Sequence, residues 1–354
     1  MLTIGVAARN EEATIADALR SIDEALTELP TEVNVEVIVA VNDSTDRTKE
    51  IADAHARRNP RCRVIESPPG LVAAQRAIAT AATGTRHTPG RSSIADDRPA
   101  RVDRPARASR GPSSPDYLIF VDADCLLDRQ CLSRLTEVME DPAIQATWAT
   151  RVLAGSTRPG FWQATVNFGD YHSDVIVRGH YLVGQAFAIR NYEVAYGSRD
   201  GQPQNVVTHL QLDRGPLTDD SYLSRALIND HGPDAIRPAP GAIVYAQPMR
   251  TLRDLYRAQR RKAYEVERLN LLFPELRTIR GKHFGRRCDA AAYTRLSRIE
   301  RLQCRLYLPL YANLWRLAQW QLAVNLWLLR RGVPLRPTNL WPVVEGTKKA
   351  FPVT

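Results

Sequence analysis

The sequence predicts an α/β fold in which a mostly parallel sheet is flanked by helices. Residues 35–41 and 117–121 are almost wholly apolar, as strands buried on both faces of a parallel sheet are. Between the apolar runs, hydrophobic residues recur at intervals of three and four, which is the spacing of a helix packed on a core. Polar residues directly follow the runs, so ligand-binding side chains are expected at the carboxyl edge of the sheet.

Strands and helices are expected to alternate through the first half of the chain. The predicted strands are residues 2–8, 35–41, 63–65 and 117–121. Helical patterns cover residues 15–29, the stretch that ends near residue 51, residues 71–82 and residues 132–139. A series of this kind indicates a parallel sheet with helices on both of its faces.

The composition is that of an ordinary globular protein with a basic charge balance. Of 354 residues, 44% are hydrophobic and 25% are charged, and the net charge is +9. These values exclude disordered and fibrous proteins, and the positive charge favours acidic partners such as nucleotides, lipid head groups or nucleic acid. The five cysteines form no C-x-x-C pair, which excludes a small disulfide scaffold and predicts buried or chance surface thiols in a reducing compartment.

Neither a signal peptide nor a membrane span is expected. Met1 leads straight into an apolar strand, and no uncharged apolar run reaches about 18 residues. We therefore expect a cytoplasmic protein, with peripheral contact at the inner face of the membrane as the alternative.

Residues 85–115 differ in composition from the segments around them. They are rich in Arg, Pro, Ser and Asp and contain almost no apolar residues. Such a segment buries too little apolar surface to fold alone, so a mobile insertion is expected. Two interpretations of its arginines stay open: contact with a membrane or an anionic donor, and a solvated tether without a function.

Two carboxylates, Asp122 and Asp124, follow the strand at residues 117–121. Separated by one residue at a strand end, they can reach the same hard cation. Mg²⁺ and Mn²⁺ are typically held by one or two carboxylates, and substrate phosphates complete the shell. The alternative is a capped turn that leads into the next helix.

Four motifs in order resemble those of inverting GT-A glycosyltransferases of family 2. Residues 4–12 resemble the opening strand that ends in Asn-Glu, and residues 39–48 resemble the second-strand motif that contacts the nucleotide base. Residues 120–124 match the metal-binding motif. Residues 216–225 resemble the stretch that carries the catalytic base, and the Gly-rich strand before it is matched by residues 184–190. The likeness covers roughly residues 1–265.

The resemblance implies metal-dependent transfer of a sugar, with inversion, from a nucleotide-diphospho-sugar to the hydroxyl of a glycan, a lipid-linked or a small-molecule acceptor. It implies Asp220 as the catalytic base with Asp219 beside it, and Asp124 with Asp122 as the ligands of Mg²⁺ or Mn²⁺. The nucleotide-binding residues that it implies are Ala8, Asn10, Glu11, Asp43, Gln75 and Asp122. On the side of the diphosphate and acceptor, it implies Gln259, Arg261 and Lys262.

Structural roles stay open for several of these residues. Asn10 and Glu11 are equally suited to capping a helix, and Asp219 and Asp220 to the first turn of a helix capped by Thr218. In the second case both roles can hold together, because the cap would fix the carboxylates in place.

The chain departs from the family pattern in ways that affect the donor more than the fold. Gln75 and Arg76 stand where Arg-Asn is frequent, and Asn42 replaces a frequent Asp. The insertion at residues 85–115 separates two segments that are normally adjacent in the family. The Q-x-x-R-W element near the acceptor is matched only in part, by residues 259–263.

The C-terminal third has an aromatic, basic character. Residues 306–329 form an amphipathic helix pattern with three tryptophans, and Arg330 and Arg331 stand at its end. Three interpretations of residues 306–331 stay open: contact with a membrane interface, packing on the catalytic domain, and packing on a second subunit. The oligomeric state is left open.

Four regions are therefore expected. They are a nucleotide-binding half at 1–84, the insertion at 85–115, a metal- and acceptor-binding half at 116–265 and a helical region at 266–354. Two other functions are less compatible with the sequence. A nucleic-acid-binding protein would leave the clustered carboxylates without a role, so no nucleic-acid partner is expected. A sugar nucleotidyltransferase would need a longer phosphate loop after the first strand than residues 7–10 provide.

Overall fold

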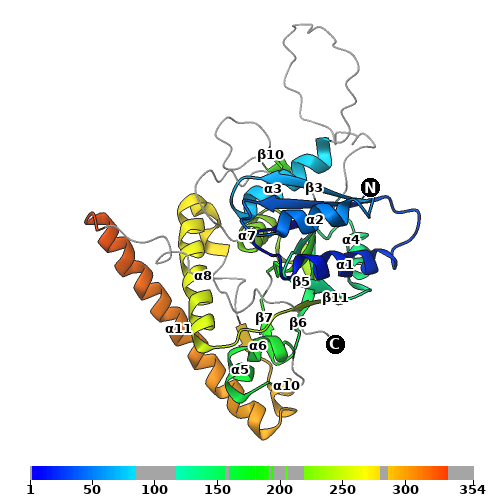
Figure 1. Ribbon diagram of the computed structural model, residues 1–354. Coiled ribbons are helices and arrows are strands. Elements are labelled where there is room, and N and C mark those ends of the chain that lie inside the picture. Colours follow the sequence, from blue (N-terminus) through cyan, green and yellow to red (C-terminus); the bar gives the residue numbers. More distant parts are fainter. Residues whose placement is uncertain are drawn as a thin grey trace, which may run out of the picture.

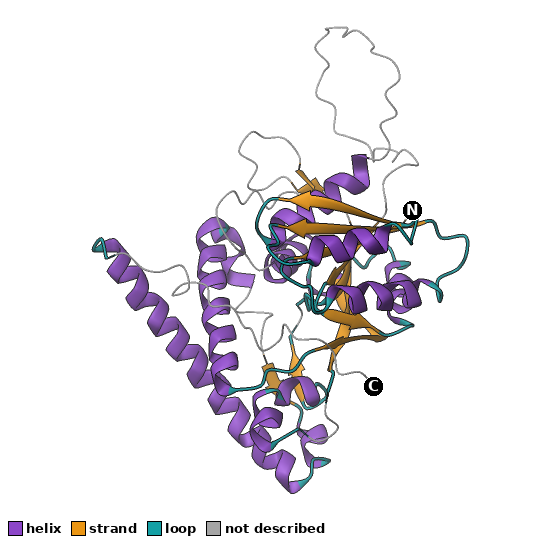
Figure 2. Cartoon of the chain, viewed as in Figure 1, coloured by secondary structure: helices purple, strands orange, loops and turns teal. Residues whose placement is uncertain are grey.

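The computed structural model describes residues 2–84, 117–155, 159–179, 181–190, 193–194, 204–205, 219–279 and 286–333. The expected insertion at 85–115 lies outside these residues, as do residues 216–218 of the fourth motif. The described part is an α/β domain with a helical region beside it (Figures 1 and 2).

The domain is built on one eight-stranded sheet with the order β3-β2-β1-β4-β8-β6-β11-β5. Parallel pairing joins β3 to β2, β2 to β1, β1 to β4 and β6 to β11. In contrast, β8 runs antiparallel to both of its neighbours, and so does the edge strand β5 to β11. The bounds are β1 (Leu2–Ala8), β2 (Val35–Asn42), β3 (Cys62–Ser67), β4 (Tyr117–Asp122), β5 (Cys125–Leu127), β6 (Ala146–Leu153), β8 (Ala186–Arg190) and β11 (Ile236–Ala246).

Helices cover both faces of the sheet, as expected. On one face, α1 (Ile15–Leu26), α2 (Thr48–Ala56) and α4 (Cys131–Met139) bury apolar side chains against it. On the other face, α3 (Leu71–Gly84) and α7 (Asp219–His231) share a core with the end of α8 (Leu252–Leu272). The contact of α3 with β1 is very close, because a Cβ on Gly5 would lie 2.6 Å from Cγ2 of Ile78. The α/β class with a mostly parallel sheet is thus confirmed.

A second, smaller core lies below the sheet in Figure 1, where α5 (Phe161–Val166), α6 (Phe168–Tyr171), α10 (Ala290–Thr294) and α11 (Arg298–Arg330) meet. Here β7 (Ile176–Arg178) pairs with β12 (Arg286–Cys288), so residues more than 100 positions apart in the chain lie side by side. The remaining short elements are β9 (Glu193–Val194), β10 (Gln204–Asn205) and the 3₁₀ turns at Pro233–Ala235 and Pro274–Leu276.

The long helix α11 crosses α8 at an angle and packs against part of it (Figure 1). A hydrogen bond of 2.5 Å from the Tyr256 hydroxyl to Oε1 of Gln321 joins the two helices. The helix expected from residue 306 begins earlier, at Arg298, because Ser297 and Glu300 form a capping box there. The boundary expected at 265 falls inside α8. Among the described helices, none is long and apolar enough to cross a bilayer.

All five cysteines are free thiols, and four of them are buried while Cys288 is exposed. The expectation of buried or surface thiols without disulfides is confirmed.

Candidate active site

The loops after β1 and β2 both turn through the left-handed region of backbone conformation. The φ angles of Asn10 and Asp43 are +54° and +48°. Asn and Asp tolerate this conformation better than other residues with a side chain. Two of the predicted nucleotide-binding residues are therefore the points at which these loops change direction, at the carboxyl ends of adjacent parallel strands.

Hydrogen bonds join these two loops to each other. Oδ1 of Asn10 accepts from the backbone N–H of Thr45 at 2.9 Å, and the N–H of Asn10 donates to Oγ of Ser44 at 3.1 Å. The N–H of Glu11 donates to Oγ1 of Thr48 at 2.7 Å. The helix-capping interpretation of Asn10 is wrong, since α1 begins only at Ile15 and has no side-chain cap.

The remaining candidates for nucleotide binding differ in their exposure to solvent. The Asp43 side chain is 57% exposed and forms an ion pair of 3.3 Å with Arg9. Ala8 is fully buried in the sheet. Gln75 is buried within α3. Ala8, Asn10 and Asp43 thus come together with Asp122, because β2, β1 and β4 are adjacent strands.

The turn after β4 carries a group of possible metal ligands. One donor atom from each of Asp122, Asp124 and Cys125 lies within 4.8 Å of the others. Burial, together with the two carboxylates, raises the pKa of the Cys125 thiol well above its ordinary value. Sulfur is a soft donor, whereas Mg²⁺ and Mn²⁺ prefer oxygen ligands. The two half-buried carboxylates fit Mg²⁺ or Mn²⁺, which take oxygen ligands.

Asp220 lies in the first turn of α7, which begins at Asp219. The helix-start interpretation of this pair is thus confirmed, while Thr218 and the side chain of Asp219 lie outside the described residues. Oδ1 of Asp220 accepts from the N–H of Ser221 at 2.6 Å. Burial raises the pKa of Asp220, and the positive charges of Lys262 and Arg261 and the bond from Ser221 oppose this shift only in part.

Two consecutive residues connect Asp220 with the metal carboxylates. A Cβ on Gly184 would lie 3.8 Å from Oδ2 of Asp220. The carbonyl oxygen of the next residue, Gln185, accepts from the N–H of Asp122 at 2.9 Å. Because neighbouring Cα atoms are about 3.8 Å apart, this dipeptide brings Asp220 and Asp122 to the same edge of the sheet.

α8 supplies the positive charge near Asp220. Lys262 and Arg261 both act on its pKa, and Nζ of Lys262 lies 5.6 Å from the ring centroid of Tyr181. Arg261 also lies 3.7 Å from the buried carboxylate of Glu265. Gln259 is buried, and its Oε1 has no hydrogen-bond partner among the described residues. The structure thus places the charges of Arg261 and Lys262 near enough to Asp220 to affect its pKa.

Sequence reasoning missed the role of Ser224, although this residue lies in the fourth motif. Its Oγ donates to the carbonyl oxygen of Asp220 at 2.6 Å and accepts from the N–H of Leu182 at 2.8 Å. The hydroxyl therefore ties the first turn of α7 to the segment that carries Gly184. Its place one turn after Asp220 on a helix was a signal available in the sequence.

A group of buried charges beside the motifs was also missed. Arg151 on β6 forms an ion pair with Asp170 on α6, and the side chain of Asp170 is only 7% exposed. Arg286 on β12 contacts the hydroxyl of Tyr307 and lies 4.1 Å from the ring centroid of Tyr311. Burial opposes the charge of Arg286, but Tyr311, Tyr307 and Tyr181 together with Asp170 raise its pKa above the ordinary value. No local sequence pattern marks these contacts.

The segment that carries the first two motifs also matches a known family. The model of glycosyl transferase family 2 matches residues 3–86. No curated protein sequence matches the chain.

Two solved structures are similar at low identity. Glucosyl-3-phosphoglycerate synthase from Mycobacterium tuberculosis, in complex with Mn²⁺, UDP-glucose and phosphoglyceric acid, is 17% identical with a TM-score of 0.41. That similarity covers 78% of this chain and 79% of the other. Mannosyltransferase PcManGT from Pyrobaculum calidifontis, in complex with GDP-Man and Mn²⁺, is 18% identical with a TM-score of 0.46, and 98% and 84% of the two chains are covered. At these values the likeness does not extend to a donor or an acceptor.

The family match favours a glycosyltransferase over a nucleic-acid-binding protein or a sugar nucleotidyltransferase. The mostly parallel sheet flanked by helices fits the GT-A class. Residues 3–86 match the model of glycosyl transferase family 2, and this match supports the family and the enzyme class expected from the motifs.

Proposed function

We propose that the protein transfers a sugar from a nucleotide-diphospho-sugar to an acceptor hydroxyl, with a divalent cation as cofactor and with inversion at the anomeric carbon. The observation that carries this proposal is the position of Asp220 and Asp122 on either side of the Gly184–Gln185 dipeptide. A base and a pair of metal-binding carboxylates at one sheet edge are what such a transfer requires.

Asp124 and Asp122 are the residues that would hold Mg²⁺ or Mn²⁺. When bound, the cation stabilises the negative charge that develops on the diphosphate as the sugar–phosphate bond breaks. On the nucleotide side, the loops with Asn10 and Asp43 are the proposed contact surface. Their mutual hydrogen bonds hold this surface in shape before the donor arrives.

Asp220 is the proposed general base. Its carboxylate takes the proton of the acceptor hydroxyl as the oxygen attacks the anomeric carbon, and the nucleoside diphosphate leaves from the opposite side. The partial burial that raises its pKa also makes it a stronger base than an exposed carboxylate. Lys262 and Arg261 keep it ionised enough to act and add positive charge near the leaving group.

Calorimetry with UDP, GDP and dTDP, each with and without Mn²⁺, tests the donor half of this proposal. We expect one nucleotide to bind in a Mn²⁺-dependent manner, and Asp124→Ala to weaken that binding at least about tenfold because the cation loses a carboxylate ligand. Glu140→Gln, an exposed carboxylate on the far end of α4, is the control. Equal binding with and without the cation, or no binding of any nucleotide, would contradict the proposal.

The anomeric configuration of the product tests the mechanism. With the donor identified, ¹H NMR of the first product formed should show the configuration opposite to that of the donor sugar. Retention would exclude single displacement with Asp220 as base.

We also propose that α11 contacts an anionic membrane surface. One face of α11 packs on α8, and the opposite face carries an outer stripe of exposed apolar side chains. Trp320 in this stripe is 65% exposed and Trp327 is 51% exposed. At about 100° per residue the stripe covers about 80° of arc. Its members are Ile299, Leu302, Leu306, Leu317, Trp320 and Trp327.

Charge favours a lipid surface over a second copy of the chain as the occupant of this stripe. The arginines at 298, 301, 305, 316 and 330 lie along one side of the stripe, and Glu300 is the one acid of α11. Two such helices would repel each other, whereas anionic head groups attract them, and tryptophan favours the interface.

Sedimentation with vesicles tests the lipid contact. We expect binding to phosphatidylglycerol-containing vesicles, weaker binding to phosphatidylcholine alone, and loss of binding in Trp320→Ser/Trp327→Ser. Trp162→Ser, an equally exposed tryptophan on α5, is the control. A concentration-dependent dimer that the double variant abolishes would instead assign the stripe to a second copy.

A further inference from the structure

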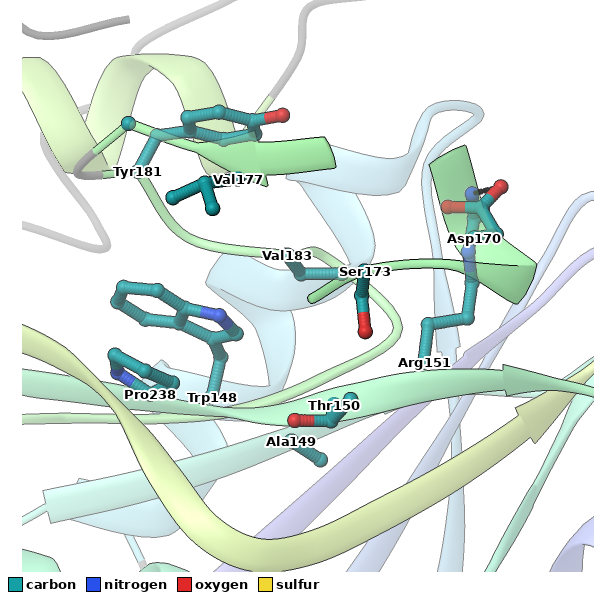
Figure 3. Close-up of a pocket in the computed structure, with 11 residues that line it drawn as sticks. Trp148, Ala149, Thr150, Arg151, Asp170, Ser173, Val177, Tyr181, Val183 and Pro238 are labelled. Atoms are coloured by element: carbon teal, nitrogen blue, oxygen red, sulfur yellow. Dashed lines mark hydrogen bonds and ion pairs between the residues drawn. The ribbon is translucent and has the colours of Figure 1, made fainter. Parts of the chain in front are cut away.

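A cavity of about 290 Å³ lies beside the proposed base and has no role in the function derived so far. It is bounded by β6 below, by the segment from α6 to β7 on one side and by residues 181–183 above (Figure 3). Trp148, Thr150 and Arg151 come from β6, and Asp170, Ser173 and Tyr181 line the rest.

The cavity adjoins the proposed reaction centre at two points. Val183 lines it, and the next residue, Gly184, is the one whose Cβ position lies 3.8 Å from Oδ2 of Asp220. Tyr181 also lines it, and Lys262, whose charge acts on Asp220, lies over the Tyr181 ring. The cavity is therefore adjacent to the segment that contacts Asp220, the proposed base.

The charges around the cavity are mainly positive. Arg151 lines it, Arg286 is close enough to Asp170 and Tyr181 for their charges to interact, and Lys262 lies on the ring of Tyr181. Asp170 is the acidic side chain among the residues that line it. Asp170 engages Nη2 of Arg151, and Nε of Arg151 has no hydrogen-bond partner within the described part of the chain.

We infer that this cavity holds the acceptor, and that the acceptor is a small hydroxylated molecule with a carboxylate or phosphate group bound near Arg151. This inference rests on the proposed function. The volume lies at the lower end of the range for small-molecule sites, so it suits a molecule no larger than about one sugar ring rather than a polymer. The acidic group gives the Arg151 guanidinium a second acceptor, and the tryptophan and tyrosine rings provide faces for the carbon skeleton.

Three probes with the same number of carbons and different charge test this inference. Glycerol, glycerate and glycerol phosphate are titrated into the protein that carries its nucleoside diphosphate and Mn²⁺. We expect the carboxylate or phosphate probe to bind at millimolar concentration and glycerol to bind at least about tenfold more weakly, since a charge-assisted contact is lost. Glycerol that binds as well as both acidic probes, or no binding by either acidic probe, overturns the inference.

Variants of one exposed residue test the location. Ser173→Trp fills the cavity from its exposed side, and Ser173→Ala is its matched control. We expect the tryptophan variant to lose binding of the acidic probe about tenfold or more while nucleotide binding stays unchanged, and the alanine variant to behave as the parent chain. Unchanged probe binding in Ser173→Trp overturns the placement.

A second pair of variants tests the role of charge. Arg151→Gln leaves Asp170 buried without its ion pair, so the double variant Arg151→Gln/Asp170→Asn is made as well to remove both charges together. We expect both to weaken binding of the acidic probe about ten- to a hundredfold. Parent-like binding in the double variant overturns the role of Arg151. Failure of the nucleotide to bind to the parent chain would contradict the proposed function. Failure of the acidic probes alone, with the nucleotide bound, would contradict only the inference about the acceptor cavity.

Discussion

The proposed donor side and the proposed acceptor side of the site hold their charges in different ways. On the donor side, Asp43 and Arg9 are about half exposed, and the loops around them are held by hydrogen bonds between backbone and side chains. On the proposed acceptor side, Asp220 is partly buried and the Arg151–Asp170 pair is largely buried. Exposed charges are screened by water and salt, whereas buried charges act strongly on each other and on a ligand. Chemistry is therefore expected on the acceptor side and recognition on the donor side.

The largest expected contrast comes from removing one carboxylate on each side. Asp220→Asn should lower kcat by about 10²–10⁴-fold because the general base is lost, with nucleotide binding unchanged. Asp43→Asn should instead weaken nucleotide binding and leave kcat within a small factor. Steady-state kinetics and calorimetry measure both effects, and Asp234→Asn, exposed beyond the end of α7, serves as control. Near-normal turnover in Asp220→Asn would remove this residue from the reaction.

The next effect concerns the hydroxyl that positions Asp220. Ser224→Ala should lower the free energy of unfolding by about 1–3 kcal/mol, because the buried N–H of Leu182 loses its acceptor. It should also lower kcat more than KM, since α7 and the Gly184 segment are no longer tied together. Urea unfolding and kinetics check this, with Ser133→Ala on α4 as the matched control. An unchanged unfolding energy would show that the bond contributes nothing.

Substitutions in the donor-side loops should change stability according to the backbone conformation that the new residue can adopt. Asn10→Ala should lose about 1–2 kcal/mol of stability, because alanine is strained at a φ of +54° and the bond to Thr45 is removed. Asn10→Gly removes the same bond but adopts this φ freely, so its loss should be about 1 kcal/mol smaller. Thermal unfolding separates the two variants. Equal losses would show that the conformation of Asn10 is not under strain.

The smallest effect is a shift in pH dependence. Burial raises the pKa of Asp220, and the base works only when ionised, so activity should fall with decreasing pH at a higher pH than an ordinary Asp would give. The charge of Lys262 lowers this pKa, so Lys262→Met should move the acid limb of kcat/KM to still higher pH. Lys49→Met, on the surface of α2, should leave the limb in place. A shift to lower pH would contradict the electrostatic account.

The positions of the residues on the proposed donor side could be predicted from the sequence because local signals define them. Parallel strands are continuous apolar runs, and the polar residues that follow them meet at one edge whatever the details of packing. Asn10, Asp43 and Asp122 could be placed in this way from their neighbours in the chain alone. The antiparallel direction of β8 and of β5 has no such local signal and was not predicted.

The acceptor side could not be predicted to the same extent, because its contacts join distant segments. Arg151 and Asp170 are 19 positions apart, and Arg286 is brought to them only by the pairing of β12 with β7. Neither the periodicity of hydrophobic residues nor a short sequence motif encodes such a contact. The early start of α11 was missed for another reason: its capping box precedes the aromatic residues that marked the helix.

The two faces of α8 have a mechanical consequence. This helix places Lys262 and Arg261 near Asp220, and a hydrogen bond from Tyr256 to Gln321 joins it to α11. Since a helix moves as a nearly rigid rod, any displacement of α11 that carries α8 with it would change the distance of these two positive charges from Asp220. The position of α11 would thereby influence the basicity of the proposed base.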